Sequence, residues 1–266
     1  MNKVVLREEL RLLASRGSTR AAVIGSVLAG LAAVAAVAVW RAVAPEAPAG
    51  VTLPRGSGVT AAGWALSLRN FFVLPLLLAH ATAASLAGDT ADRTLREVLL
   101  APVARARVLA ARLTALAVLA ATCTVLTLLA SALPGAVLFG TGEPVGRLLT
   151  GYLASFASDL GLLAAAACLA LWVRSTTGAV LSLAFALALD LALQGALRAA
   201  SGLAAMGVPI PLAPAQALAP YTFGASLAVW EDWETGLDGV GFIALAVWAT
   251  AFMLLAVSRI RHTEVG

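Results

Sequence analysis

The stretch of sequence that decides the fold is GDTADRTLREVLLAPVARARVLAAR, residues 88–112. It is a long charged segment between two runs of apolar residues, each long enough to cross a lipid bilayer. Leu95, Val98 and Leu99 recur at helical spacing, while the charged side chains fall mostly on the other side. This periodicity predicts a short amphipathic helix outside the hydrocarbon, between two membrane spans.

Capping and proline signals set the limits of this helix, which we expect over about residues 89–101. Thr94 followed by Glu97 is a capping-box pattern, and Asp89 would cap an earlier start. Pro102 would end the helix because it has no backbone N–H and its ring clashes with the preceding turn. An ordinary interfacial helix between two spans would show the same pattern. Three basic residues then lead into the next apolar run: Arg105, Arg107 and Arg112.

The composition of the 266-residue chain is that of a membrane protein, with 61% hydrophobic and 12% charged residues. The formal net charge is +4, but the basic residues stand at the ends of apolar runs, where they set orientation. Nucleic acid is therefore not an expected partner. Cys123 and Cys168 lie inside apolar runs without metal-ligand spacing, so we expect buried free thiols.

Six apolar runs predict an all-α integral membrane protein, in which residues 1–266 form a single transmembrane domain. An N-terminal interfacial helix is expected before the first span, because Leu6, Leu10 and Leu13 share one helical face. Residues 198–237 are apolar but carry several prolines, which predicts short re-entrant helices at the outer face. The predicted spans are residues 21–40, 64–87, 108–133, 148–173, 178–197 and 240–257.

The distribution of arginine predicts the orientation, since basic residues concentrate on the cytoplasmic side of membrane proteins. With both termini in the cytoplasm, most basic residues and the 88–112 stretch fall on the inner side. We therefore expect a multi-pass protein of the inner (plasma) membrane. The outer side would keep the basic residues Arg41, Arg55, Arg69, Arg147 and Arg198 and the acids Glu231, Asp232, Glu234 and Asp238.

The 88–112 stretch resembles the cytoplasmic loop of type-2 permeases of ATP-binding-cassette (ABC) transporters. In that loop an acidic residue is followed by three further residues and then by Gly-Thr-Leu. Another acidic residue, a pair of leucines, a proline, a basic residue and a closing lysine follow. Its places are taken here by Asp89, Arg93, Thr94, Leu95, Arg96, Val98, Leu99, Pro102, Arg105 and Arg112. The broken segment before the last span is a second point of resemblance.

The resemblance implies that the predicted helix is a coupling helix, which contacts a separate ATPase. The residues implied in this coupling are Asp89, Asp92, Arg93, Thr94, Leu95, Arg96, Glu97, Val98, Leu99 and Pro102. A Walker A loop needs a Gly-Lys pair, and the only lysine is Lys3, so no ATP site is expected in this chain. Two partner ATPase subunits would hold ATP and Mg²⁺.

The resemblance also implies a second permease copy, because one six-span half needs another to complete a pathway through the lipid. Span five carries a small-xxx-small face suited to a homodimer seam, formed by Ala184, Ala188, Ala192 and Ala196. An exporter is expected. A role in relaying force to an extracytoplasmic partner is an alternative.

Two acids are expected inside the membrane, Asp159 and Asp190, each about fifteen residues from Arg174 on the two arms of one hairpin. Ionisable groups in a span are costly, so they are candidates for a substrate pathway, where they would share a proton or meet a cationic part of a substrate. Gln194 lies one turn from Asp190 on the same stripe, and His80 is a weaker candidate in span two. Simple neutralisation of each acid by a neighbouring arginine or serine is the alternative.

The sequence holds no H-E-x-x-H, G-x-S-x-G or C-x-x-C motif. An intramembrane enzyme acting on lipid or peptide is the alternative from a different class. Its nearest approach to a catalytic pair is Asp159 with His80. We predict no catalytic residue, metal ligand or cofactor in this chain.

Overall fold

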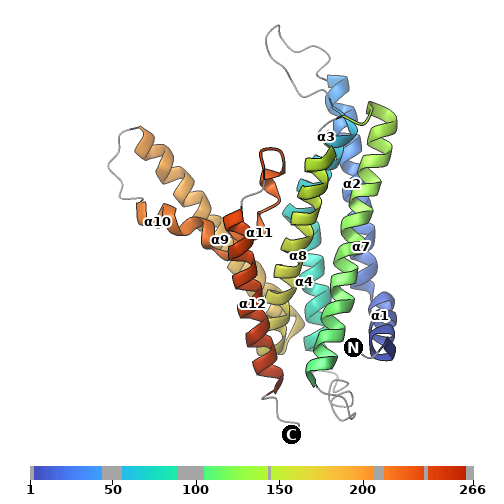
Figure 1. Ribbon diagram of the computed structural model, residues 1–266, viewed down its shortest axis with the longest axis vertical. Helices are drawn as coiled ribbons and strands as arrows, with labels where there is room; N and C mark the ends of the chain where they lie inside the picture. The colour runs from blue at the N-terminus through green and yellow to red at the C-terminus, as the bar shows by residue number, and fades with distance from the viewer. Residues whose placement is uncertain are drawn as a thin grey trace.

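The computed structural model describes residues 3–43, 56–88, 105–142, 145–206, 213–236 and 239–261. All the elements in these ranges are helical, and the long helices form a bundle (Figure 1). Within these ranges, five helices are long and apolar enough to cross a membrane, and a bent pair would make a sixth. The expectation of an all-α fold is thus confirmed. The five helices are α2 (Gly17–Val43), α7 (Arg105–Phe139), α8 (Val145–Val173), α9 (Thr176–Ala205) and α12 (Gly239–Arg261).

Several helices extend beyond the predicted spans, and α7 does so through a proline. The sequence predicts an end at Leu133 followed by a turn-rich loop, whereas α7 continues past Pro134 to Phe139. Helical bonding resumes after the proline, since the Gly140 N–H donates to the Ala136 carbonyl at 3.0 Å. Prolines are tolerated inside membrane helices where local adjustments satisfy the freed backbone groups.

The second predicted span is a broken helix. Its halves bend by 44° with respect to each other. At the break the Leu74 N–H donates to the Arg69 carbonyl, five residues back, which is π-helical geometry. Pro75 follows directly, and a wider turn accommodates a residue that has no N–H and a ring that clashes with the turn before it. The segments are α3 (Gly58–Leu68), η1 (Arg69–Val73), α4 (Leu74–Ala83) and η2 (Ala84–Gly88).

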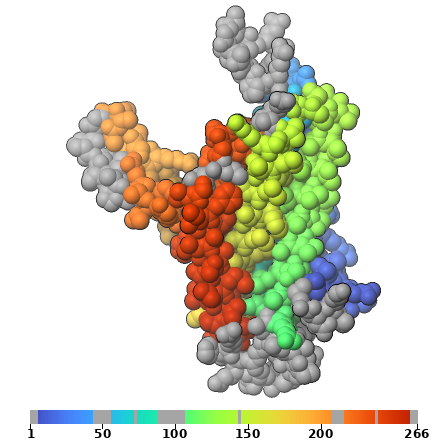
Figure 2. Space-filling view, viewed as in Figure 1, coloured from blue at the N-terminus to red at the C-terminus, as the bar shows by residue number. Residues whose placement is uncertain are grey.

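The long helices differ sharply in burial. In the most apolar window of each helix, 67% of the residues of α8 are buried but only 6% of those of α9. α8 is therefore the centre of the bundle, whereas α9 projects from its side together with α10 (Ala213–Leu218) (Figure 2). Most of the apolar surface of α9 is left for lipid or another protein. Its exposed large side chains include Leu181, Phe185, Leu189, Leu191 and Leu193.

Between α9 and α12 the chain forms short helices: α10, η3 (Ala219–Tyr221), α11 (Phe223–Leu227) and η4 (Glu231–Trp233). The start of the predicted 198–237 segment belongs instead to α9, which runs to Ala205. Aromatic contacts attach α11 to α12, because the Phe223 ring lies 6.0 Å from that of Trp248 and 5.1 Å from that of Phe252. α11 is thus packed against α12.

The N-terminal helix α1 (Lys3–Ser15) lies at the same end of the bundle as the last turns of α12 (Figure 1). It is tied to α7 through Arg112, whose Nε donates to Glu9 Oε1 at 3.2 Å. The same guanidinium donates to the Ser85 carbonyl in η2 at 2.6 Å. One buried arginine therefore joins α1 to the two helices that flank residues 89–104. The helix predicted over 89–101 lies outside the described residues.

Candidate functional site

A cavity of about 400 Å³ lies between η1, α8, α9 and the short helices α11 and η4. Its volume falls within the ~300–1,000 Å³ typical of small-molecule sites. The walls are mostly apolar, with a limited set of charged and amide side chains among them. These are Asn70, Asp159, Asp190, Gln194, Arg198, Glu231 and Asp232.

Three of the four predicted substrate-pathway residues meet at this cavity. Asp159 comes from α8, and Asp190 and Gln194 come from α9. The α8–α9 hairpin brings them together by reversing the chain at Arg174, which takes a left-handed φ of 57°. His80 is not among the lining residues and is an exposed residue of α4.

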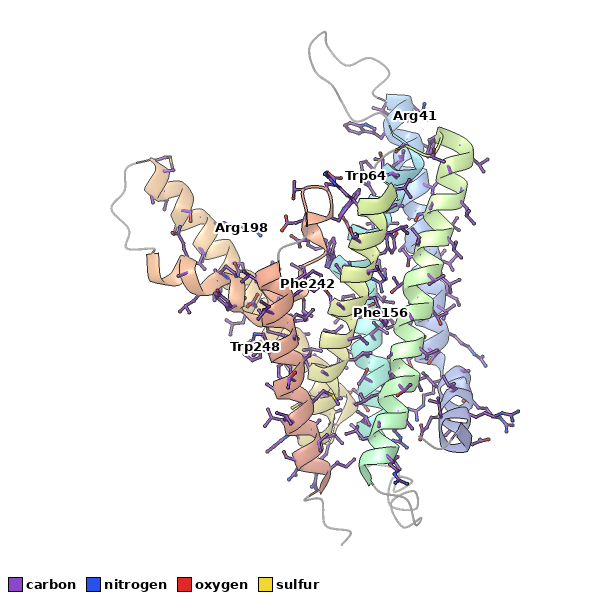
Figure 3. All side chains as sticks on the ribbon, in the orientation of Figure 1. Arg41, Trp64, Phe156, Arg198, Phe242 and Trp248 are labelled. Atoms are coloured by element: carbon purple, nitrogen blue, oxygen red, sulfur yellow. The ribbon has the colours of Figure 1, made fainter. Side chains whose placement is uncertain are left out.

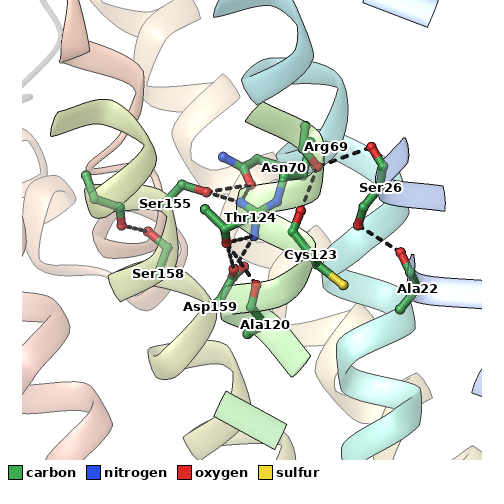
Figure 4. A network of polar contacts seen from close by, with 12 residues as sticks. Ala22, Ser26, Arg69, Asn70, Ala120, Cys123, Thr124, Ser155, Ser158 and Asp159 are labelled. Carbon is green, nitrogen blue, oxygen red and sulfur yellow. Dashed lines mark hydrogen bonds and ion pairs between the residues drawn. The ribbon is translucent and has the colours of Figure 1, made fainter. Parts of the chain in front are cut away.

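Asp159 forms a buried ion pair with Arg69 at the π-helical break (Figure 4). The Arg69 guanidinium also donates to Thr124 Oγ1 at 2.7 Å, to Asn70 Oδ1 at 2.9 Å and to Ser155 Oγ. Arg69 is 1% exposed and Asp159 is 4% exposed. These hydrogen bonds offset the cost of removing both charges from water. Arg69 is therefore the group that neutralises Asp159.

The position of Arg69 corrects the prediction from the arginine distribution, which assigns this residue to the outer side. The structure instead buries its side chain inside the bundle. The sequence does carry a signal for this, because a lone arginine within an apolar span is costly unless an acid at a similar depth can pair with it. Asn70 and Thr124, which complete the network, carry no comparable signal.

Asp190 and Gln194 attach α9 to the short helices. A Cβ atom at Gly224 would lie 2.7 Å from the Asp190 Cγ, so any larger residue there would displace this carboxylate from its position against α11. Gln194 Nε2 donates to the Ala219 carbonyl at 3.0 Å and to Thr222 Oγ1 at 3.1 Å. Within the described ranges, no ion pair or hydrogen bond is made to the Asp190 carboxylate.

Three further charges line the cavity from its periphery. Glu231 and Asp232 belong to η4, and Arg198 lies on the side of α9 that faces the bundle (Figure 3). Nearby protein atoms displace part of the water around the Glu231 carboxyl, which raises its pKa above the ordinary value of 4.5. Arg198 opposes this rise and Asp232 adds to it. The sequence predicts both acids on the outer side but does not indicate that they belong to the site.

The predicted ATPase-coupling residues lie outside the described part of the chain, and their placement stays a prediction. They are Asp89, Asp92, Arg93, Thr94, Leu95, Arg96, Glu97, Val98, Leu99 and Pro102. In the described ranges no group of three or more His, Cys, Asp or Glu side chains is placed to hold a metal ion. The cavity provides charged groups, hydrogen-bonding groups and an apolar wall.

Comparison with known families agrees with the resemblance seen in residues 88–112. The family described as ABC-2 family transporter protein matches residues 20–192, which is more than half of the chain. The matched range runs from α2 into α9 and includes the Arg69–Asp159 pair and Asp190. A search of curated proteins finds no match. Its described residues include five to six helices long and apolar enough to cross a membrane, and the chain is a multi-pass membrane protein that belongs to the ABC-2 transporter family.

Proposed function

We propose that the chain is the permease subunit of an ATP-driven exporter, in which two separate ATPase subunits supply the energy. The observation that carries this proposal is the family match over residues 20–192, because members of this family are the membrane components of ABC transporters. ATP and Mg²⁺ would be bound by the ATPases. The N- and C-termini would lie in the cytoplasm.

The coupling step would use the 88–112 stretch. The apolar face of its helix, with Leu95, Val98 and Leu99, would fill a groove on the ATPase, and its charges would fix the register. Closure of the ATPase pair would then tilt the flanking helices. The Arg112 contacts support this scheme, since they join α1 to η2 and α7, the helices on either side of the coupling stretch.

A second permease copy would complete the transport pathway. The support for this is α9, whose apolar surface is almost entirely unburied in one copy. Ala188, Ala192 and Ala196 are exposed along this helix and would allow two helices to approach closely. The enzyme alternative receives no comparable support, because His80 does not line the cavity that contains Asp159.

The test is purification of the tagged full-length chain from its native membrane, with measurement of nucleotide hydrolysis in the purified complex. An ATPase subunit should co-purify, and Leu95→Glu or Leu99→Glu should abolish its association or its coupling to transport. Thr235→Glu, which adds the same charge at an exposed residue of the η4 region, is the control. Full transport activity of the chain without any nucleotide-hydrolysing companion would overturn the proposal.

A further inference from the structure

We infer that the cavity between α8, α9, α11 and η4 binds an amphipathic cation, through the cationic group and an adjacent hydrogen-bond acceptor of that molecule. The inference rests on the proposed transport function for its biological meaning, since the bound molecule would be the exported substrate. It depends on the charges that line the cavity, an amide donor without a partner among the described residues, and the apolar wall.

The charges lining the cavity leave an excess of negative charge. Asp159 is neutralised by Arg69, so it contributes no net charge. Of the remaining groups, Asp190, Glu231 and Asp232 are acids, and Arg198 is the one base among the described residues that line the cavity. Because low-dielectric walls focus the field of such groups, the cavity attracts a cation and repels an anion.

Asp190 marks the inner end of this charged region. Its carboxylate lies against the Gly224 backbone, and among the described residues it has neither an ion-pair partner nor a hydrogen-bond donor. A carboxylate held between two helices without a counter-charge is costly. A ligand cation beside it would supply the missing partner, as Arg69 does for Asp159.

A buried amide nitrogen provides an independent sign of a ligand. Asn70 lines the cavity, and its Nδ2 atom is buried without a hydrogen-bond partner in the described part of the protein. The orientation of the amide is fixed, because its Oδ1 accepts from Arg69 at 2.9 Å and from Ser155 Oγ at 3.0 Å. The free donor is therefore Nδ2, and an ether, hydroxyl or carbonyl oxygen of the ligand would satisfy it.

The wall of the cavity suits an apolar body next to the cation. It includes Phe71 and Trp230, whose rings meet edge to face with centroids 6.1 Å apart, and several leucines. Aromatic faces also attract cations directly. An inorganic cation would leave this apolar surface unused, so the geometry favours an organic amine or quaternary ammonium compound of amphipathic character.

The experiment uses two probes of matched size and shape with opposite charge, tetraphenylphosphonium and tetraphenylborate. Binding of each is measured to the purified full chain in phosphatidylcholine nanodiscs, with empty nanodiscs subtracted. Tetraphenylphosphonium should bind and tetraphenylborate should not. Asp190→Asn and Glu231→Gln should each weaken tetraphenylphosphonium binding about tenfold, and Arg198→Gln should strengthen it severalfold, as expected for one charge acting across a partly wet cavity.

Glu234→Gln is the matched control, because Glu234 is an exposed acid next to η4 that does not line the cavity. The Glu234→Gln variant should bind tetraphenylphosphonium as tightly as the wild type does. If Asp190→Asn does not fold, the Glu231→Gln and Asp232→Asn variants at the periphery carry the test. Absence of tetraphenylphosphonium binding, equal binding of tetraphenylborate, or cavity variants that bind like Glu234→Gln would each overturn the inference. No ATPase is present in this assay, so its result is separable from failure of the proposed function.

Discussion

Arg69 and Asp159 are 90 residues apart in the sequence and form an ion pair inside the bundle. The arginine lies at the π-helical break in the second span, and the aspartate lies on α8, the most buried of the long helices. Asp159 also lines the cavity. The pair thus joins the break in one helix to the wall of the candidate binding site.

Removal of one partner of this pair should destabilise the protein strongly. Asp159→Asn leaves the Arg69 charge buried without its counter-ion, which typically costs about 3–5 kcal/mol. Replacing both partners together, Arg69→Met with Asp159→Leu, should cost less than the sum of the two single changes. The loss of stability of each variant is measured by thermal unfolding of the purified proteins in the same detergent. Strictly additive losses would show that the two side chains do not interact.

Gly224→Ala should loosen the attachment of α11 to α9. The new Cβ would overlap the Asp190 carboxyl group, 2.7 Å from its Cγ, so the Asp190 side chain or one of the two helices must move. Gly202→Ala in α9 is the control, because no atom lies within 4 Å of a Cβ there and the change should be neutral or slightly stabilising. The two variants are compared by the sensitivity of the 206–236 region to protease. Equal protection of this region in both variants would contradict the expectation.

Glu9→Gln should impair the coupling of ATP hydrolysis to transport while leaving the ATPase subunits bound. The change weakens the contact between α1 and Arg112, on which we expect the position of the coupling stretch to depend. A loss of about 2- to 30-fold in coupled transport corresponds to the usual range of coupling energies. Glu8→Gln, an exposed neighbour on the same helix, should behave like the wild type. Equal transport per ATP in both variants would refute this role.

Binding of tetraphenylphosphonium should weaken as the pH falls. Only the ionised form of Glu231 attracts the cation, and its raised pKa means that it takes up a proton at a higher pH than an ordinary glutamate. Arg198, Asp232 and Asp190 line the same cavity, and Asp159 is held by its own arginine. The difference in affinity between the wild type and Glu231→Gln should therefore shrink as the pH falls through a value above 4.5. A pH-independent difference would contradict this.

The sequence could predict the spans and three of the cavity residues, Asp159, Asp190 and Gln194, but not how the site is assembled. An apolar run of about twenty residues dictates a membrane helix regardless of what surrounds it, so the number and order of the long helices follow from composition. The break at Arg69 is set by the π turn before Pro75, a proline that hydropathy alone does not distinguish. The pairing of Arg69 with Asp159 and the position of Glu231 at the cavity depend on contacts between distant segments, which periodicity does not report.

Because of the π turn at Arg69–Val73, the direction of the second span depends on the number of residues in that turn. One residue added to or removed from a helical turn rotates everything beyond it by about 100° and shifts it by about 1.5 Å. A single deletion within residues 70–73 would leave the hydropathy profile almost unchanged. It would nevertheless swing the Arg69 side chain away from Asp159, or re-aim the end of η2 from which the coupling stretch departs. Homologous chains that differ in length at this one turn should therefore differ in how their inner and outer halves are aligned.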